Sequence, residues 1–227
     1  VKARNRVFEL AEQHFTDNYV LITYDDDYIC PSKDWLSPIC KWLSNERIGM
    51  VGGSVINLRR RRIDPDFNLN ILPYAADVLT KATGFIFLDI KHGPRYVEYT
   101  TPLMAIKMSL VKKGLRYDPE FRGTGYREES DLQEQVHRLG YRIVFEPRFY
   151  VYHLNLEEGG NRTIQDVTTR FYWKARNHTY FVLKHRKPAY KLILSNLIIM
   201  AYALLHGSKA LTSAMQGLRE ALSLKCS

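Results

Sequence analysis

Helix-like and strand-like patterns of hydrophobic positions alternate along the first two thirds of the sequence. Apolar residues of Ala3–His14 fall on one face at helical spacing, and the apolar run Tyr19–Tyr24 has the length of a strand. Further strands are predicted at Met50–Ile56, Phe85–Ile90, Leu103–Lys107, Tyr141–Glu146 and Phe149–Leu154. Further helices are predicted at Trp35–Leu43, Ser109–Lys113 and Glu128–Leu139, and a loop at Arg59–Thr83. This alternation indicates an α/β fold with a mixed, mostly parallel sheet and helices on both faces, where ligands bind beyond the carboxyl ends of strands.

Beyond Asn161 the pattern changes to long helices. These are predicted at Ile164–Arg186, at Tyr190–His206 and in an amphipathic stretch with Leu211, Met215, Leu218 and Leu222. The chain is therefore divided into a core at 1–155, a helical extension at 156–188 and apolar or amphipathic helices at 189–227. The apolar segment 192–205 is shorter than the roughly 18 residues that usually cross a bilayer. Flanked by Lys and Arg, it either lies in a membrane interface or packs on its own core or a partner chain.

The charge balance narrows the class of partner without choosing one. A formal net charge of +9 favours polyanions, which include nucleic acid, an anionic membrane surface and the phosphates of a small substrate. The run Arg59–Arg62 is interpreted as a solvated loop. The basic residues from Lys184 to Lys191 border the most apolar segment, which favours a membrane surface. The 45% hydrophobic content supplies a core and excludes a disordered chain.

Cysteine usage and the first residues bear on the cellular compartment. Cys30, Cys40 and Cys226 have neither an even count nor a metal-binding spacing, so a reducing, cytosol-facing setting fits better than a disulfide scaffold or a zinc site. The segment Val1–Ala11 is charged throughout and lacks the apolar region of a signal peptide. The predicted localisation is cytoplasmic, at the cytoplasmic face of a membrane.

Three consecutive carboxylates, Asp25, Asp26 and Asp27, follow the first predicted strand. Their mutual repulsion makes the arrangement costly without a cation. Carboxylate oxygens favour hard ions such as Mg²⁺ or Mn²⁺, and an ion with one or two protein carboxylates completes its shell with water and substrate phosphate. A diphosphate ligand is therefore the natural candidate, and an acidic turn exposed to water is the alternative.

A second acidic group, Glu128, Glu129 and Asp131, begins a predicted helix after the glycine-containing segment Phe121–Tyr126. Helix N-termini stabilise ionised carboxylates, and an ionised carboxylate can take a proton from an attacking hydroxyl. The ordinary alternative is the acid enrichment of a first helical turn. His153, at the end of the last predicted strand, is either a structural residue or a neutral imidazole ligand beside a carboxylate-bound metal.

Taken together, these residues resemble glycosyltransferase family 2, the large inverting family with the GT-A (Rossmann-like) fold. The segment ARNRVFELAEQ is similar to the family's Ala-Arg-Asn helix, and VLITYDDDYICPSKDWL to its strand, aspartate motif and Trp-Leu helix. GMVGGSV resembles the next strand, and TTPLMAIKMSLVKKGLRYDPEF resembles the segment that lines the acceptor side. GTGYREESDLQEQVHRLGYRIVFEPRFYVYHL is similar to the acidic catalytic helix and the terminal histidine strand. The resemblance extends from Ala3 to about His153.

The resemblance implies an inverting transferase that moves a sugar from a nucleotide diphosphate donor to an acceptor hydroxyl, with Mn²⁺ or Mg²⁺ as cofactor. It implies that the three aspartates bind the donor, and that Asp27 is the best metal ligand, with Asp25 and His153 as the others. Glu129 is the implied base, with Glu128 and Asp131 as its nearest rivals.

Other segments extend or qualify this resemblance. FYWKARNHTYFVLKH resembles the C-terminal extension of relatives in polysaccharide biosynthesis, which implies a lipid-linked or surface glycan as acceptor. The family's first strand-helix-strand unit, which grips the nucleotide base, is expected before Val1, so the chain is expected to be truncated. Gln135 stands where many relatives have arginine, and Arg138 is a candidate substitute.

Two other functions remain open at this point. The +9 charge and the 15 tyrosines suggest a nucleic-acid-binding domain, but no such motif is found and the acidic clusters would repel phosphates without a metal. No nucleic-acid partner is therefore predicted, and oligonucleotide binding that weakens steeply with salt would revive that function. A metal-dependent phosphohydrolase would use the same carboxylates to activate water, and product analysis separates hydrolysis from transfer.

Overall fold

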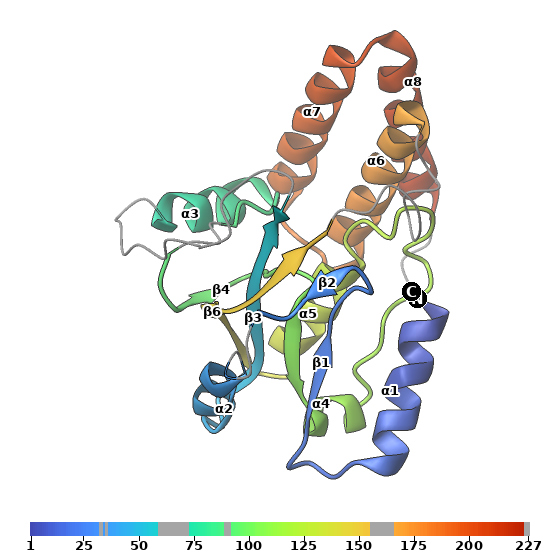
Figure 1. The fold of residues 1–227 in the computed structure, drawn as a ribbon. Helices are drawn as coiled ribbons and strands as arrows, with labels where there is room; N and C mark the ends of the chain where they lie inside the picture. The colour runs from blue at the N-terminus through green and yellow to red at the C-terminus, as the bar shows by residue number, and fades with distance from the viewer. Residues whose placement is uncertain (32–33, 35, 59–72, 89–91, 155–165, 225–227) are drawn as a thin grey trace.

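The computed structural model of this 227-residue chain describes residues 1–31, 34, 36–58, 73–88, 92–154 and 166–224. The strands of this part are β1 (Val20–Thr23), β2 (Tyr28–Ile29), β3 (Ile48–Asn57), β4 (Arg95–Val97), β5 (Met104–Lys107) and β6 (Arg142–His153). The helices are α1 (Lys2–His14), α2 (Ser37–Leu43), α3 (Pro73–Thr83), α4 (Met108–Lys112), α5 (Glu128–Arg138), α6 (Val167–Lys184), α7 (Ala189–Leu205) and α8 (Ser208–Ser223). The predicted α/β class, with its helical C-terminal part, is confirmed (Figure 1).

The strands form one mixed sheet in the order β1-β5-β3-β6-β2, and β4 pairs with the first half of β6. β1, β3 and β6 run in the same direction, but β5 runs in the opposite direction between β1 and β3. Within the described residues, β3 with β6 is therefore the parallel pair, and the prediction of a mostly parallel sheet is wrong. The period of hydrophobic positions shows which face a side chain occupies and carries no information on strand direction.

Helices cover both faces of this sheet, as predicted. Met50 and Ile106 point to the face covered by α1, α4 and α5, whereas Val51 and Ala105 point to the face covered by α2. Neighbouring residues of one strand thus belong to different clusters, as the alternation of side chains along a strand requires. Both faces are buried, which explains why β3 and β5 read as nearly continuous apolar runs.

Two segments differ from the sequence prediction. Residues 73–83, predicted as loop, form α3, and the proline that counted against a helix stands at its first position, where it is compatible with helical geometry. Residues 85–88 form no strand. The Thr80 hydroxyl accepts from the Phe87 amide at 2.8 Å and donates to the Phe87 carbonyl at 3.0 Å, so a side chain takes the hydrogen bonds that a neighbouring strand would provide. Residues 59–72, including the run Arg59–Arg62, and residues 89–90 lie outside the described part.

The two strands predicted near the end of the core are the halves of one strand, β6. Gly52 of β3 pairs with Phe145, and Ser54 pairs with Tyr150, so extra residues of β6 bulge out between the halves. Glu146 lies in this bulge, where Arg148 and Trp42 donate to its buried carboxylate. Beyond the bulge the second half of β6 continues to His153 at its end, between β3 and β2.

The C-terminal helices α6, α7 and α8 rise from one end of the sheet (Figure 1). The amphipathic stretch predicted over 211–222 is α8, but its buried face is the small-residue face, Ala210, Ala214, Gly217 and Ala221. Met215 and Leu222 are instead exposed. Tyr99 and Phe121 pack on Phe181 of α6, so this helix is in contact with the part of the chain that carries the sheet. The division at residues 155 and 188 stays a prediction.

The close approach of α8 to α6 gives a first testable prediction. A Cβ on Gly217 would lie 2.2 Å from the backbone oxygen of Tyr172, so Gly217→Ala must push the helices apart. We expect it to lower the free energy of unfolding by about 1–3 kcal/mol, despite the roughly 1 kcal/mol by which alanine favours a helix. Urea denaturation measures this, with Gln216→Ala at the exposed neighbouring position as control. A Gly217→Ala variant more stable than the parent would contradict this packing.

Candidate active site

The first part of the site forms where β3 and β6 end. Asn57 and His153, the last residues of these strands, are register partners. Asp27 precedes β2, is only 4% exposed, and its carboxylate lies 2.9 Å from His153 Nε2. Asn57 Oδ1 lies 3.0 Å from His153 Nδ1. The Asp27 carbonyl accepts from the Leu154 amide at 3.0 Å, which ties this turn to the end of β6. The structure therefore brings Asp27 and His153 together at the ends of β3 and β6.

The second part is a cluster of carboxylates around Arg4 of α1. Arg4 Nη2 donates to Asp25 Oδ1 at 3.1 Å. Arg4 Nη1 donates to Glu128 Oε1 at 2.6 Å and to Glu129 Oε1 at 2.9 Å. The aspartate turn after β1 and the acidic start of α5 therefore meet at one guanidinium. Asp25 lies two residues from Asp27, so both parts belong to one region.

The turn before α5 determines where the two glutamates point. Gly125 has a φ of 66°, and a Cβ there would lie 2.9 Å from the Glu128 carboxylate. Arg127 has a φ of 77°, which is uncommon for a residue with a side chain. Its buried guanidinium lies 4.8 Å from the centre of the Phe181 ring and donates to the Gly84 carbonyl. These contacts hold the left-handed backbone that directs Glu128 and Glu129 toward Arg4.

Burial and mutual repulsion alter the acidity of the two glutamates. Burial, and then the charge of Glu129, raises the pKa of Glu128 to about 7, although Arg4 opposes this shift. Burial also raises the pKa of Glu129, again against the effect of Arg4. Raised carboxyl pKa values are common at functional sites, because a base works best when its pKa is near the working pH.

The remaining predicted residues lie differently. Asp131 is fully buried and turned away from Arg4, since its carboxylate lies 2.6 Å from Lys184 Nζ and 2.8 Å from His185 Nε2. Asp26 is exposed. The structure thus brings Asp25, Glu128 and Glu129 together and separates Asp131 from them.

Apart from Arg186, the basic residues from Lys184 to Lys191 are buried or paired with acidic side chains, and the membrane surface predicted for this run stays a prediction. Lys184 also pairs with Asp118 at 2.7 Å, and Lys187 pairs with Glu134. Lys191 is 9% exposed. Acidic partners distant in the sequence decide where these cations point, and Arg186 is the exposed member of the run.

We tested whether these residues suit a divalent cation. Within the described part of the chain, no group of three His, Cys, Asp or Glu side chains forms a metal cluster. Asp27 Oδ2 and His153 Nε2 are 2.9 Å apart, close to the roughly 3 Å between adjacent ligands of an octahedral ion with bonds of about 2.1 Å. Such an ion needs few protein ligands when phosphates complete its shell. The spacing of Asp27 and His153 suits a cation, Asp25 faces Arg4, and all three stay predicted ligands.

Sequence reasoning missed three residues of this region. Arg4 is the centre of the carboxylate cluster, and its presence in the Ala-Arg-Asn segment was a usable signal. Asn57 and Tyr28 flank His153, and the Tyr28 ring lies edge-on at 5.1 Å. Burial and the charge of Asp25 raise the pKa of Tyr28, which keeps its hydroxyl protonated. Nothing in the sequence pattern marks Asn57 or Tyr28.

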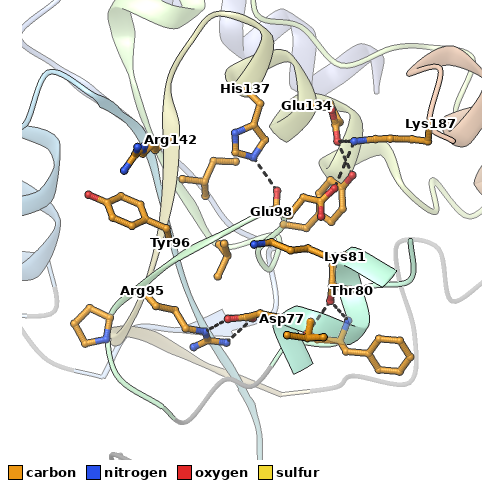
Figure 2. Close-up of a pocket in the computed structure, with 16 residues that line it drawn as sticks. Asp77, Thr80, Lys81, Arg95, Tyr96, Glu98, Glu134, His137, Arg142 and Lys187 are labelled. Atoms are coloured by element: carbon orange, nitrogen blue, oxygen red, sulfur yellow. Dashed lines mark hydrogen bonds and ion pairs between the residues drawn. The ribbon is translucent and has the colours of Figure 1, made fainter. Parts of the chain in front are cut away.

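A pocket of about 840 Å³ lies elsewhere on the protein (Figure 2). α3, β4, the second half of α5 and the start of β6 line it, whereas His153 ends β6. Arg95 donates to Asp77 at 2.7 Å, and Lys187 pairs with Glu134 and, at 3.4 Å, with Glu98. None of the predicted site residues lines this pocket, and the acidic side chains that line it are held in ion pairs. The candidate chemistry therefore lies outside it.

Comparison with known proteins gives distant likenesses in structure alone. No family model and no curated protein matches the sequence. A mannosyltransferase, PcManGT from Pyrobaculum calidifontis, solved in complex with GDP-Man and Mn²⁺, is similar with 17% identity and a TM-score of 0.49, over 97% of this chain and 55% of that one. A mycobacterial protein is similar with 15% identity and a TM-score of 0.43, over 79% of this chain and 49% of that one. The chain spans about half the length of both structures, and these likenesses are too distant to say what it binds.

Proposed function

We propose that this chain belongs to an inverting, metal-dependent glycosyltransferase of family 2 with a GT-A fold. The substrate would be a nucleotide diphosphate sugar, and the product a glycoside of an acceptor hydroxyl. One observation carries the proposal: Asp25, Glu128 and Glu129 meet at Arg4. Asp25 is two residues before Asp27 in the sequence, and Asp27 contacts His153. The ordered motifs from Ala3 to His153, which resemble the family, support the same function.

Each residue has a role that follows from its surroundings. Asp27 and His153 would hold the cation beside the end of β6, where Asp27 Oδ2 and His153 Nε2 are already 2.9 Å apart. A bound Mn²⁺ or Mg²⁺ would supply positive charge that stabilises the departing diphosphate. Asp25 and Asp26, next to Asp27 in the sequence, would border the nucleotide diphosphate sugar. Arg4 would position Glu129 by its hydrogen bond at 2.9 Å.

Glu129 is the best candidate for the base. Its side chain is 21% exposed, compared with 8% for Glu128 and 0% for Asp131, so it is the member of the group that an acceptor can reach. In the proposed reaction the acceptor oxygen attacks the anomeric carbon while the bond from that carbon to the diphosphate oxygen breaks. Glu129 takes the hydroxyl proton, and the nucleoside diphosphate leaves with the bonding electrons, so the configuration inverts.

The acceptor and the location of the enzyme are proposed from the resemblance of the C-terminal segment. The segment FYWKARNHTYFVLKH lies mostly in α6 and resembles the extension of relatives that act on lipid-linked or surface glycans. A lipid-linked acceptor in polysaccharide biosynthesis would place the enzyme at the cytoplasmic face of a membrane.

The raised pKa of the base predicts a pH dependence. A general base must be ionised, and burial raises the pKa of Glu129, so kcat/KM is expected to fall with decreasing pH above the ordinary glutamate pKa of about 4.3. Arg4 lowers the pKa of Glu129, so Arg4→Gln is expected to move this acid limb to higher pH. A pH–rate profile with saturating donor measures both. An acid limb near 4.3 that Arg4→Gln leaves in place would exclude Glu129 as the base.

The function is tested by nucleotide release from a panel of nucleotide sugars, with Mn²⁺ and with or without membrane lipid extract, in the protein that contains this chain. We expect release with one donor class, dependence on the metal, and stimulation by an acceptor in the extract. A free sugar as the product at the same rate with and without the extract would identify a hydrolase. No release from any donor would reject the proposal.

A further inference from the structure

The polarity of helix α7 is reversed relative to that of an ordinary surface helix. Its outward side chains are large and apolar: Ile193 and Leu197 are each 61% exposed, and Leu205 is 83% exposed. Within residues 192–205 no exposed residue is charged. Its buried face includes the polar residues Lys191, Ser195 and Asn196. A helix that faces water has the opposite arrangement, with its apolar stripe toward the core.

Buried hydrogen bonds fix this orientation. Thr179 of α6 donates to Asn196 Oδ1 at 3.0 Å, and Asn196 Nδ2 donates to the Leu192 carbonyl at 2.9 Å. Ser195 donates to the Lys191 carbonyl at 2.5 Å. Turning α7 to bury its leucines would break the contact between Thr179 and Asn196 and expose Ala203 and Ile199, which belong to the cluster with α6 and α8. The apolar face is therefore held outward by the packing of the other face.

The charge around α7 favours an anionic surface. Residues 186–219 contain no Asp or Glu, and their exposed cations are Arg186, Lys209 and Arg219, since Lys187 is paired with Glu134 and Lys191 is buried. Arg186 precedes α7 and Lys209 follows it, and both side chains are exposed. Cations at the ends of an apolar face suit a lipid interface with anionic headgroups, where the apolar side chains enter the acyl boundary and the cations stay near phosphates. Two copies of this chain would instead bring like charges together.

We propose that the outward face of α7 docks on an anionic lipid surface, with the helix lying in the interface. The docking face consists of Ile193, Leu194, Leu197, Leu204 and Leu205. In the described residues no helix has the length and apolarity needed to span a bilayer. The inference makes the proposed membrane location specific, and it is independent of the transferase chemistry, because lipid binding needs neither donor nor cation.

Vesicle co-sedimentation tests this inference, with phosphatidylcholine vesicles that contain or lack phosphatidylglycerol and with no sugar nucleotide present. The variant Ile193→Glu/Leu197→Glu places two charges on the docking face. The matched control Val7→Glu/Leu10→Glu changes two exposed apolar residues of α1, which are 53% and 39% exposed. We expect the parent to bind the anionic vesicles more tightly than the neutral ones. The docking variant should lose at least about tenfold in affinity, since each lost leucine-sized contact is worth about that factor, and the control should bind like the parent.

Several results would overturn the inference. These are no binding of the parent to anionic vesicles, an equal loss in both double variants, or a lipid-free dimer that the docking variant dissociates in sedimentation equilibrium. Far-UV circular dichroism verifies the fold, and Leu205→Glu, at the most exposed position, replaces the double variant if that variant unfolds. Failure here leaves the proposed transferase standing, because binding of a nucleoside diphosphate by Asp27 is measured without lipid.

Discussion

Replacing Glu129 with glutamine is expected to lower the rate of sugar transfer by roughly 10²–10⁴-fold, the usual contribution of a general base. Glutamine keeps the size of the side chain and can still meet Arg4, but it cannot take a proton from the acceptor. Binding of the donor, which involves Asp27 and its neighbours, is expected to stay within about threefold of the parent, because the substituted group lies on the acceptor side. Transfer at saturating donor and a separate donor titration measure the two effects.

The rival carboxylates provide the controls for this variant. Glu128→Gln removes a neighbour that also touches Arg4, so we expect a smaller loss of transfer than for Glu129→Gln. Asp131→Asn leaves Lys184 and His185 without their buried anion, which is expected to cost about 3 kcal/mol of stability rather than the chemical step. A larger loss of kcat in folded Glu128→Gln or Asp131→Asn than in Glu129→Gln would reassign the base.

Asp27→Ala is expected to remove nearly all metal-dependent transfer. The Asp27 carboxylate is buried, lies beside His153 and is the strongest candidate ligand for the cation. Without it the departing diphosphate loses charge stabilisation, which is usually the largest catalytic contribution. Isothermal titration calorimetry of the Asp27→Ala variant with a nucleoside diphosphate in the presence of Mn²⁺ measures this. The variant is expected to bind the nucleotide at least about 10-fold more weakly than the parent, in the range seen when support of a metal site is removed.

Two nearby aspartates show whether this effect is specific. Asp34→Asn changes an exposed carboxylate outside the proposed site and is expected to behave like the parent. Asp26→Asn alters the exposed member of the aspartate turn and is expected to have an intermediate effect on donor affinity. Unchanged activity of Asp27→Ala with an unchanged response to Mn²⁺ would refute the assignment of Asp27.

Much of the fold was predictable where a segment decides its own structure. The helix at 2–14, the strand at 48–57 and the helix at 128–138 have clear periods of hydrophobic positions, and the structure places them within a few residues of the prediction. The local pattern failed where a distant partner decides. Phe87 bonds to the Thr80 hydroxyl instead of a neighbouring strand, and the direction of β5 depends on which neighbours it meets.

The candidate site was predictable to a similar extent. The aspartate turn and the acidic helix start were identified from the sequence, and both meet at Arg4. Asp131 lies two residues after Glu129, a rotation of about 200° around a helix, so the two cannot face the same cleft. Residue identity alone did not reveal that Lys184 and His185 would bind Asp131 and not Glu129. The reversed polarity of α7 was also hidden, because only the packed helices show which face is buried.

The decisive measurement is anomalous scattering from crystals grown with Mn²⁺ and a nucleoside diphosphate. We expect a manganese peak bound by Asp27 and His153, with the diphosphate completing its shell and Glu129 facing the open acceptor side of the same cleft. A manganese peak and a nucleotide bound elsewhere, such as the pocket beside Arg95, with the Asp27–His153 contact unchanged, would contradict the proposed site.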